Sequence, residues 1–494
     1  MKKRKVVCIV AMIVLVMGGI LMLSGCGAPP SKADGTTTDQ VYNEKGDASQ
    51  EGETTTTEEK GEEKVNNMYI SASKLNVRED ATQDAPIVDS LMKGTAVEVL
   101  EEKTNDQNDL WYKVKFHMTS TEGEGTGWVL ATYTVKDRME LLDESLRNLD
   151  FSPQDKVYEY PDNPRKEARG VYVTIYSASN SRIDELIEMA KRTKINAFVI
   201  DVKDDNGTML FKTKAAEKFS PDANKKAPVK DIQALMKKLK DNDIYAIARI
   251  VSFKDPTYAK HHPERAIVYR DSGKPFTNRD GLIWVSAHDR ELWEYNIEVS
   301  KEAVEAGFNE IQFDYVRFPA SNGGKLDKLL DYRNTTGESK PETIQNYLKY
   351  AREQLASKQA YISADIYGLV GSVADDMALG QYWEAVSNVV DYVSPMMYPS
   401  HYANGTYGLS VPDAYPYETI YQGTKDAIAR NKNIQTPATI RPWIQDFTAP
   451  WVKGHIKYGP KQLEDQIRAL EENGVTEYLL WNAGNRYSEE AVKK

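Results

Sequence analysis

Ile311-Gln312-Phe313-Asp314-Tyr315-Val316-Arg317-Phe318-Pro319 begins as a short apolar run and ends in polar residues. Side chains alternate between the two faces of a strand, so Gln312 and Asp314 share one face while Ile311 and Phe313 share the other. The apolar pair is expected to pack against helices, and the polar pair to point the opposite way. The stretch therefore predicts a parallel strand that ends with an inward-facing carboxylate at Asp314.

Seven other apolar runs alternate with amphipathic helical stretches. These seven runs are Gly170–Ile175, Ile195–Asp201, Ile244–Ile250, Tyr361–Ile366, Val390–Tyr398, Ala438–Trp443 and Tyr478–Asn482. Glu310–Asp314 is the eighth. Eight strands alternating with helices over about 320 residues predict an α/β fold, a closed (β/α)8 TIM barrel. A doubly wound open sheet is the alternative, but no glycine-rich phosphate loop follows the first strand, where residues 176–180 read Tyr-Ser-Ala-Ser-Asn.

Three acidic side chains, Asp201, Asp314 and Asp365, end such runs. They are expected to meet at the barrel mouth, because the active site of a (β/α)8 barrel lies at the carboxyl ends of its strands. Hydrolysis of a glycosidic bond needs two carboxyl groups, one as acid and one as nucleophile or base. Asp314 and Asp365 are the predicted catalytic pair, and Arg249 or Arg317 is expected to hold Asp314 ionised. For a single Asp, capping of the next helix is the alternative.

The stretch Phe313–Pro319 also resembles the fourth-strand motif of a bacterial glycosyl hydrolase domain family related to α-amylase-like barrels. Gly170–Tyr172, Ala197–Lys203, Ser394–Tyr402 and Arg441–Phe447 agree with it, so the resemblance covers the chain from Ala168 onward. It implies the barrel fold and a nucleophile after the fourth strand. It also implies an acid/base after the fifth strand, where Glu is usual and this sequence has Asp365.

Carbohydrate sites use aromatic platforms and planar hydrogen-bonding groups, and several such residues are expected at the same rim. The candidates for substrate binding are Asp201, Lys203, Arg249, Arg317, Tyr398, His401, Arg441, Trp443, Gln445, Trp481 and Asn482. Taken singly, six of these residues are better explained by packing or loop structure, and their shared location favours a site. The six are Tyr398, His401, Trp443, Gln445, Trp481 and Asn482. No metal site and no cofactor is expected.

Residues 67–136 show short alternating runs separated by turn residues, which is the pattern of a small β barrel. The expected strands include Leu75–Arg78, Val97–Leu100, Trp111–Val114 and Gly127–Val129, with a turn at Lys93–Thr95. Their order resembles a bacterial SH3 domain, which implies cell-wall association, with a wall peptide as partner, or a spacer role. Residues 137–167 are expected to connect this domain to the barrel at 168–494.

Residues 1–25 are predicted to be a lipoprotein signal peptide. Lys2–Lys5 precede an apolar run to Leu23, and Leu23–Cys26 resembles the bacterial lipobox, which implies cleavage before Cys26 and lipidation of its thiol. An uncleaved transmembrane anchor is the alternative. Residues 26–66, acidic and rich in Thr and Glu, are expected to be a disordered tether. The expected location is the outer face of the cell membrane, held by the lipid anchor.

Composition narrows the partners. The net charge of -11 disfavours nucleic acid, and the only cysteines, Cys8 and Cys26, precede the folded part. The predicted partner is a polysaccharide or peptidoglycan substrate. A non-catalytic glycan-binding or wall-binding protein is one alternative. A metal-dependent polysaccharide deacetylase using Asp204–Asp205 with His261–His262 is another, although adjacent His residues point apart on a helix.

Overall fold

The computed structural model describes residues 67–72, 74–118, 123–136 and 138–494. The predicted signal peptide, Cys26 and the tether lie outside the described residues. Among those described, the chain forms two compact units that divide between Asp143 and Glu144. Within these ranges, no helix is both long enough and apolar enough to cross a membrane.

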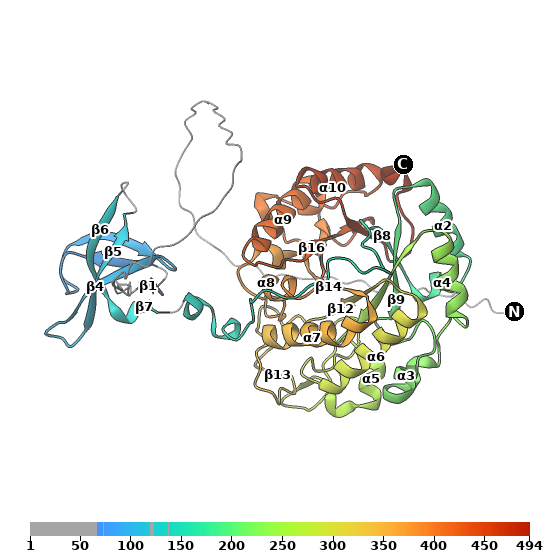
Figure 1. The fold of residues 1–494 in the computed structure, drawn as a ribbon, viewed down its shortest axis with the longest axis horizontal. Coiled ribbons are helices and arrows are strands. Elements are labelled where there is room, and N and C mark those ends of the chain that lie inside the picture. The colour runs from blue at the N-terminus through green and yellow to red at the C-terminus, as the bar shows by residue number, and fades with distance from the viewer. Residues whose placement is uncertain (1–66, 73, 119–122, 137) are drawn as a thin grey trace, which may run out of the picture. The chain divides into compact units, whose positions relative to one another are not determined.

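The smaller unit is a seven-stranded antiparallel sheet, coloured blue to cyan in Figure 1. Its strands are β1 (Asn67–Ile70), β2 (Lys74–Arg78), β3 (Ile87–Met92), β4 (Ala96–Thr104), β5 (Leu110–His117), β6 (Glu124–Leu130) and β7 (Thr134–Val135). Alternate side chains such as Val77, Val97 and Val114 form its core. Gly94, with φ of 87°, makes the expected turn between β3 and β4. The predicted SH3-like barrel is confirmed.

The larger unit is a closed barrel of parallel strands, as predicted. Its strands are β8 (Arg169–Val173), β9 (Ala197–Lys203), β10 (Tyr245–Val251), β12 (Glu310–Asp314), β14 (Tyr361–Tyr367), β15 (Tyr392–Met397), β16 (Thr439–Ile440), β17 (Trp443–Gln445) and β18 (Tyr478–Trp481). They follow one another around the sheet, and pairing of β14 with β15 closes it. The strands β16 and β17 share the seventh position, because both pair with β15 and Pro442 between them has no N–H to donate.

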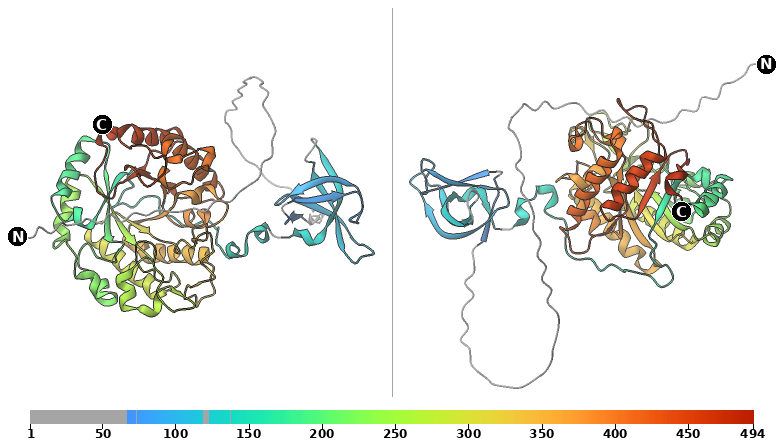
Figure 2. Two further views of the ribbon diagram at one scale, coloured as in Figure 1. Left: turned by 180° about the vertical axis from the view of Figure 1, so that it is seen from behind. Right: turned by 90° about the horizontal axis from the view of Figure 1, so that it is seen from above.

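Helices surround these strands, as Figure 1 shows, and Figure 2 gives the same ring from behind. They are α1 (Ile175–Ala178), α2 (Arg182–Arg192), α3 (Lys214–Phe219), α4 (Ile232–Asp241), α5 (Pro256–His261), α6 (Arg290–Ala306), α7 (Lys340–Leu355), α8 (Trp383–Ser387), α9 (Pro416–Asn431) and α10 (Pro460–Glu472). Several begin at a capping side chain. The N-terminus of α7, for example, has a capping box between Ser339 and Glu342.

Strand alternation separates two cores. Ile311 and Phe313 belong to the apolar layer between the strands and the helices. A second cluster, which includes Val199, Ile247 and Trp443, comes from strand positions of the opposite parity and therefore fills the barrel. The inward and outward faces expected for β12 are those that the structure has.

The segment from Glu144 to Glu167, expected to be part of a connector, belongs to the barrel's compact unit. Asn163 donates from Nδ2 to the carbonyls of Asn309 and Gln359, the residues just before β12 and β14. Tyr160 packs on Tyr361 at the start of β14. This segment therefore covers the end of the barrel where the strands begin, and only the opposite end can be the mouth.

Candidate active site

Arg249 organises the mouth of the barrel. It lies near the end of β10 with only 2% of its surface exposed, paired in register with Asp201 of β9 and Gln312 of β12. Its guanidinium donates to Asp314 Oδ2 from Nε at 2.9 Å and from Nη2 at 2.6 Å, and to Asp201 Oδ1 from Nη1 at 2.6 Å. Two of the three predicted carboxylates therefore meet on one buried cation.

Asp314 ends β12 and is bound on both oxygens. Its Oδ1 accepts the backbone N–H of Tyr315 at 2.5 Å, while Oδ2 takes the two bonds from Arg249. Tyr315 has φ of 48°, a left-handed conformation that is costly for a residue with a side chain. The chain thus turns sharply straight after Asp314 instead of entering a helix, so this carboxylate caps none. Strained backbone of this kind clusters at functional sites.

Asp201 shares Arg249 with Asp314 and also accepts the hydroxyl of Tyr172 at 2.6 Å. Burial raises the pKa of Asp201 to about 7, because one guanidinium shared among several carboxylates cannot offset the loss of water around each of them. At neutral pH this carboxyl group is therefore divided between its protonated and ionised forms.

Asp365, on the neighbouring strand β14, is in a different environment. It is 1% exposed, makes no ion pair among the described residues, and accepts Trp443 Nε1 on Oδ1 at 2.7 Å. Burial raises its pKa well above the usual range, and the nearby charge of Asp314 raises it further. Asp365 and the arginine-bound Asp314 are thus two carboxyl groups on neighbouring strands with contrasting environments.

A second cation lies at the same mouth. Lys254, from the loop after β10, is buried and contacts Asp205 Oδ2 at 3.1 Å and Asp280 Oδ2 at 2.9 Å. Asp205 also accepts from Arg249 at 3.1 Å and keeps 36% of its side chain exposed. The exposed side of Asp205 is free to meet a ligand.

Aromatic rings cover the other side of the mouth. Trp481, partly exposed at the end of β18, stacks on Tyr172 with 4.2 Å between ring centroids. Trp443 meets Trp481 edge to face at 5.6 Å, and Tyr398 lies 6.3 Å from it. His401 packs its ring against Tyr398 at 5.2 Å. These four predicted residues therefore form one cluster, in which the partly exposed indole of Trp481 suits the apolar side of a sugar ring.

The structure corrects three of the expected substrate-binding residues. Lys203 is fully buried and pairs with Asp255 at 2.8 Å, on the helix side of the sheet beside Asn296 of α6. A β-bulge in β9 explains this placement. Arg249 of β10 pairs with Asp201, but the next residue, Ile250, pairs with Lys203. Val202 is therefore the extra residue, and Lys203 points to the opposite face from the one that regular alternation predicts. Lys203 therefore supports the barrel wall and does not reach the mouth.

Arg441 and Gln445 are also fully buried, and both have structural partners. Arg441 lies between β16 and β17 and pairs inside the barrel with Glu310. Glu310 is the first residue of β12, so this ion pair is far from the mouth. Gln445 donates to Asp413 Oδ1 at 3.0 Å and accepts the N–H of Ser400 at 3.0 Å, so it holds two loops together.

Asn482 is partly exposed at the rim, whereas Arg317 is buried. Asn482 bonds to the carbonyl of Asp446 at 2.6 Å and to the N–H of Gly484 at 2.9 Å, and so it shapes the loop after β18. Arg317 does not pair with Asp314, so the cation that holds that carboxylate is Arg249.

The residues considered for a metal site do not converge. Asp204 Oδ1 accepts the N–H groups of Asn206 and Thr208 in a turn, and His262 Nε2 contacts the carbonyl of Phe219. Across the part of the chain that the structure describes, no group of three or more His, Cys, Asp or Glu side chains is placed to hold a metal ion.

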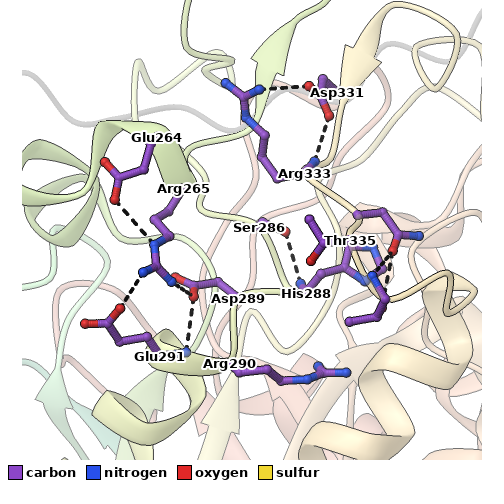
Figure 3. A pocket seen from close by; sticks show the side chains of 12 residues that line it. Glu264, Arg265, Ser286, His288, Asp289, Arg290, Glu291, Asp331, Arg333 and Thr335 are labelled. Atoms are coloured by element: carbon purple, nitrogen blue, oxygen red, sulfur yellow. Dashed lines mark hydrogen bonds and ion pairs between the residues drawn. The ribbon is translucent and has the colours of Figure 1, made fainter.

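A hollow of about 630 Å³ lies beside the loops that follow β10 and β12, and it contains none of the mouth residues (Figure 3). Arg265 crosses it between Asp289 and Glu291, and Arg333 pairs with Asp331. Its charges satisfy one another, so the mouth remains the candidate site.

Sequence reasoning missed two contributors to the mouth and assigned a third to another role. Tyr172 occupies an inward position of β8 and was detectable by the same parity that selected Asp314. Lys254 follows β10 in a long irregular loop, where no periodic pattern exists to place it. Asp205 was considered only as a metal ligand, although it directly follows the second strand.

The barrel and its mouth place the chain among glycosyl hydrolase-like barrels. Residues 170–487 match the family described as "Putative glycosyl hydrolase domain", and the chain belongs to this family. Residues 73–135 match the bacterial SH3 domain family. The resemblances to the glycosyl hydrolase domain family and to the bacterial SH3 domain are therefore confirmed.

Several solved structures are similar to the chain. A hypothetical protein from Ruminiclostridium thermocellum is 36% identical over 40% of this chain and 96% of its own, with a TM-score of 0.35. The PgaB (BpsB) glycoside hydrolase domain from Bordetella bronchiseptica is 13% identical over 64% and 94%, with a TM-score of 0.48. The spore cortex-lytic enzyme SleL of Bacillus megaterium is 12% identical over 66% and 74%, with a TM-score of 0.38. No curated protein matches the chain.

Proposed function

We propose that the barrel hydrolyses glycosidic bonds in a cell-wall or extracellular polysaccharide, with Asp314 and Asp365 as its catalytic pair. The observation that carries this proposal is the contrast between the two carboxyl groups. Asp314 is bound by Arg249 through two hydrogen bonds, whereas Asp365 is buried without a cation and has a raised pKa. Glycoside hydrolysis needs one ionised and one protonated carboxyl group at the same pH.

In the proposed reaction, Asp365 donates its proton to the glycosidic oxygen as the bond from that oxygen to the anomeric carbon breaks. Asp314 either attacks the anomeric carbon or removes a proton from the attacking water. Arg249 holds Asp314 in place through the two hydrogen bonds to its Oδ2. Trp443 orients Asp365 through the bond to Oδ1, which leaves the other oxygen of that carboxyl group to carry the proton.

Sugar rings are proposed to stack on Trp481, the partly exposed indole of the mouth. Its stacking on Tyr172 fixes the ring plane before a ligand arrives, so little side-chain entropy is lost on binding. Asp205, whose side chain is 36% exposed, is proposed to accept further hydrogen bonds from sugar hydroxyls.

The proposal is tested by measuring reducing ends released from wall preparations and exopolysaccharides. Asp314→Asn is expected to lower release by about 10²–10⁴-fold while glycan binding stays nearly intact. Asp375→Asn is the matched control, because Asp375 is an exposed carboxylate in the loop after β14. Binding by the wild type without any release would support a glycan-binding protein instead.

We further propose that the chain is lipid-anchored through Cys26 and that the SH3-like unit holds it against the cell wall. These statements rest on the lipobox-like sequence and on the SH3 family match. Metabolic labelling with a palmitate analogue tests the first, since Cys26→Ala is expected to abolish labelling. Pull-down of the unit with purified wall tests the second.

A further inference from the structure

Arg317 is a buried cation for which the described part of the chain supplies no acidic partner. Only 8% of its surface is exposed, and the hydrogen bond that the structure gives it runs from Nη1 to the carbonyl of Phe318 at 3.0 Å. A buried guanidinium normally pairs with a carboxylate, because removing the charge from water without compensation is unfavourable. Arg317 therefore has an unfilled requirement for an anion.

Three aromatic rings surround this guanidinium. Its central carbon lies 4.9 Å from the ring of Trp284, 5.1 Å from Tyr315 and 5.9 Å from Tyr367. Ring faces stabilise a guanidinium, but they do not accept its in-plane N–H groups, which suit a planar acceptor. The aromatic box fixes the direction of the guanidinium without neutralising its charge.

The box belongs to the mouth of the barrel. Tyr315 directly follows Asp314 on the loop after β12, and Tyr367 is the last residue of β14, two positions after Asp365. Tyr367 is partly exposed and lies close enough to Arg317 to be affected by its charge. Burial raises the pKa of Tyr367, and the positive charge of Arg317 lowers it. Two rings of the box therefore come from the ends of the strands that carry Asp314 and Asp365, the proposed catalytic pair.

The other two cations of the mouth are paired. Arg249 contacts Asp314 and Asp201, and Lys254 contacts Asp205 at 3.1 Å. Both Lys254 and Arg317 lie against the Tyr315 ring, at 4.3 Å and 5.1 Å, yet only Lys254 has acidic partners. One positive charge at the mouth therefore awaits a ligand.

We infer that the substrate of this site is an acidic glycan and that Arg317 binds a carboxylate carried by one of its sugars. This inference rests on the proposed function and names the substrate class of the same site. A carboxylate matches the planar fork of arginine through two parallel hydrogen bonds, and its single negative charge neutralises the single unpaired cation. The carboxylate belongs either to a uronic acid or to the lactyl group of a muramic acid.

The test compares binding of acidic glycans with binding of the same glycans after chemical reduction of their carboxyl groups. Polygalacturonate and alginate oligomers represent the uronic acids, and peptide-free peptidoglycan strands represent muramic acid. Calorimetric titration of the full chain is expected to show at least tenfold tighter binding of the acidic member in one of these two arms. The arm that responds identifies the source of the carboxylate.

Three variants assign the preference to Arg317. Arg317→Met is expected to bind the acidic and reduced members equally, and Arg317→Lys to keep part of the preference because it keeps the charge. Arg290→Met is the matched control, since Arg290 also stacks on a tryptophan, Trp293 at 3.6 Å, but outside the mouth. Hydrogen exchange of barrel peptides verifies that each variant is folded.

Equal binding of acidic and reduced members by the wild type would overturn the inference. So would failure to bind any acidic member, or a preference that survives in folded Arg317→Met. Because the readout is binding, it is separable from failure of the proposed hydrolysis. Release of reducing ends from neutral glycans alone would refute the acidic substrate but support the proposed hydrolysis. Selective binding of acidic glycans without release would support the acidic ligand but refute the proposed hydrolysis.

Discussion

Replacing Asp201 with Asn removes a carboxyl group that the folded barrel holds with a pKa of about 7, against 3.8 in water. Between pH 4 and pH 7, the folded state therefore retains a proton on Asp201 that the unfolded chain has released. A group with a raised folded pKa of this kind makes the wild type lose stability as pH rises from about 4 to about 7. Across three pH units, at 1.36 kcal/mol each, the loss is about 4 kcal/mol.

An asparagine side chain cannot titrate, so Asp201→Asn should lack this loss. The free energy of unfolding of the variant relative to the wild type is expected to rise by about 4 kcal/mol between pH 4 and pH 8. Because the carboxyl group is 3% exposed, solvent screening reduces this value little. Hydrogen exchange measured against urea concentration gives the free energy separately for peptides of β9 and of β5.

Peptides of the SH3-like unit provide the internal control, because Asp201 belongs to the barrel and their protection should not differ between the two chains. Asp375→Asn, an exposed substitution, should leave the pH dependence of the barrel unchanged. A stability difference between Asp201→Asn and the wild type that stays constant with pH would refute the reasoning. A difference of opposite sign would mean that Arg249 holds this carboxyl group fully ionised.

Two other substitutions give distinct outcomes. Arg441→Met should destabilise the barrel by about 3–5 kcal/mol in urea unfolding, since Glu310 would stay buried without its cation. Glycan binding by the folded fraction should not change. Weakened binding without a loss of stability would show that Arg441 contacts the glycan. Trp443→Phe removes the hydrogen bond that lowers the pKa of Asp365, so the alkaline limb of cleavage should move to higher pH, whereas Trp481→Phe should weaken binding without moving that limb. Identical pH profiles for the two tryptophan variants would contradict the assigned contacts.

The barrel was predictable because its signals are local and periodic. The expected strand Glu310–Asp314 has the observed bounds, and the two-residue alternation correctly separated Asp314 from Phe313. The same alternation placed Asp201 and Asp365 inside the barrel. Parity along a strand depends only on backbone geometry, so it holds wherever the strand is regular.

The site predictions are wrong where a strand is irregular, or where the sequence does not show how far along its strand a residue lies from the barrel mouth. A bulge after Asp201 reverses the direction of Lys203, and no residue pattern marks that bulge in advance. Arg441 has the inward parity of the mouth residues but lies too far from the end of its strand. Lys254 reaches the mouth through tertiary folding of a long loop, which periodicity does not describe.

The paired-carboxylate mechanism is tested most directly by comparing Asp314→Asn and Asp365→Asn on aryl glycosides of the cleaved sugar with poor and good leaving groups. A leaving group that departs without protonation no longer needs an acid. Asp365→Asn should therefore regain most of its activity on the good leaving group, while Asp314→Asn should remain inactive on both. Equal behaviour of the two variants, or full activity of either on the natural glycan, would contradict the account.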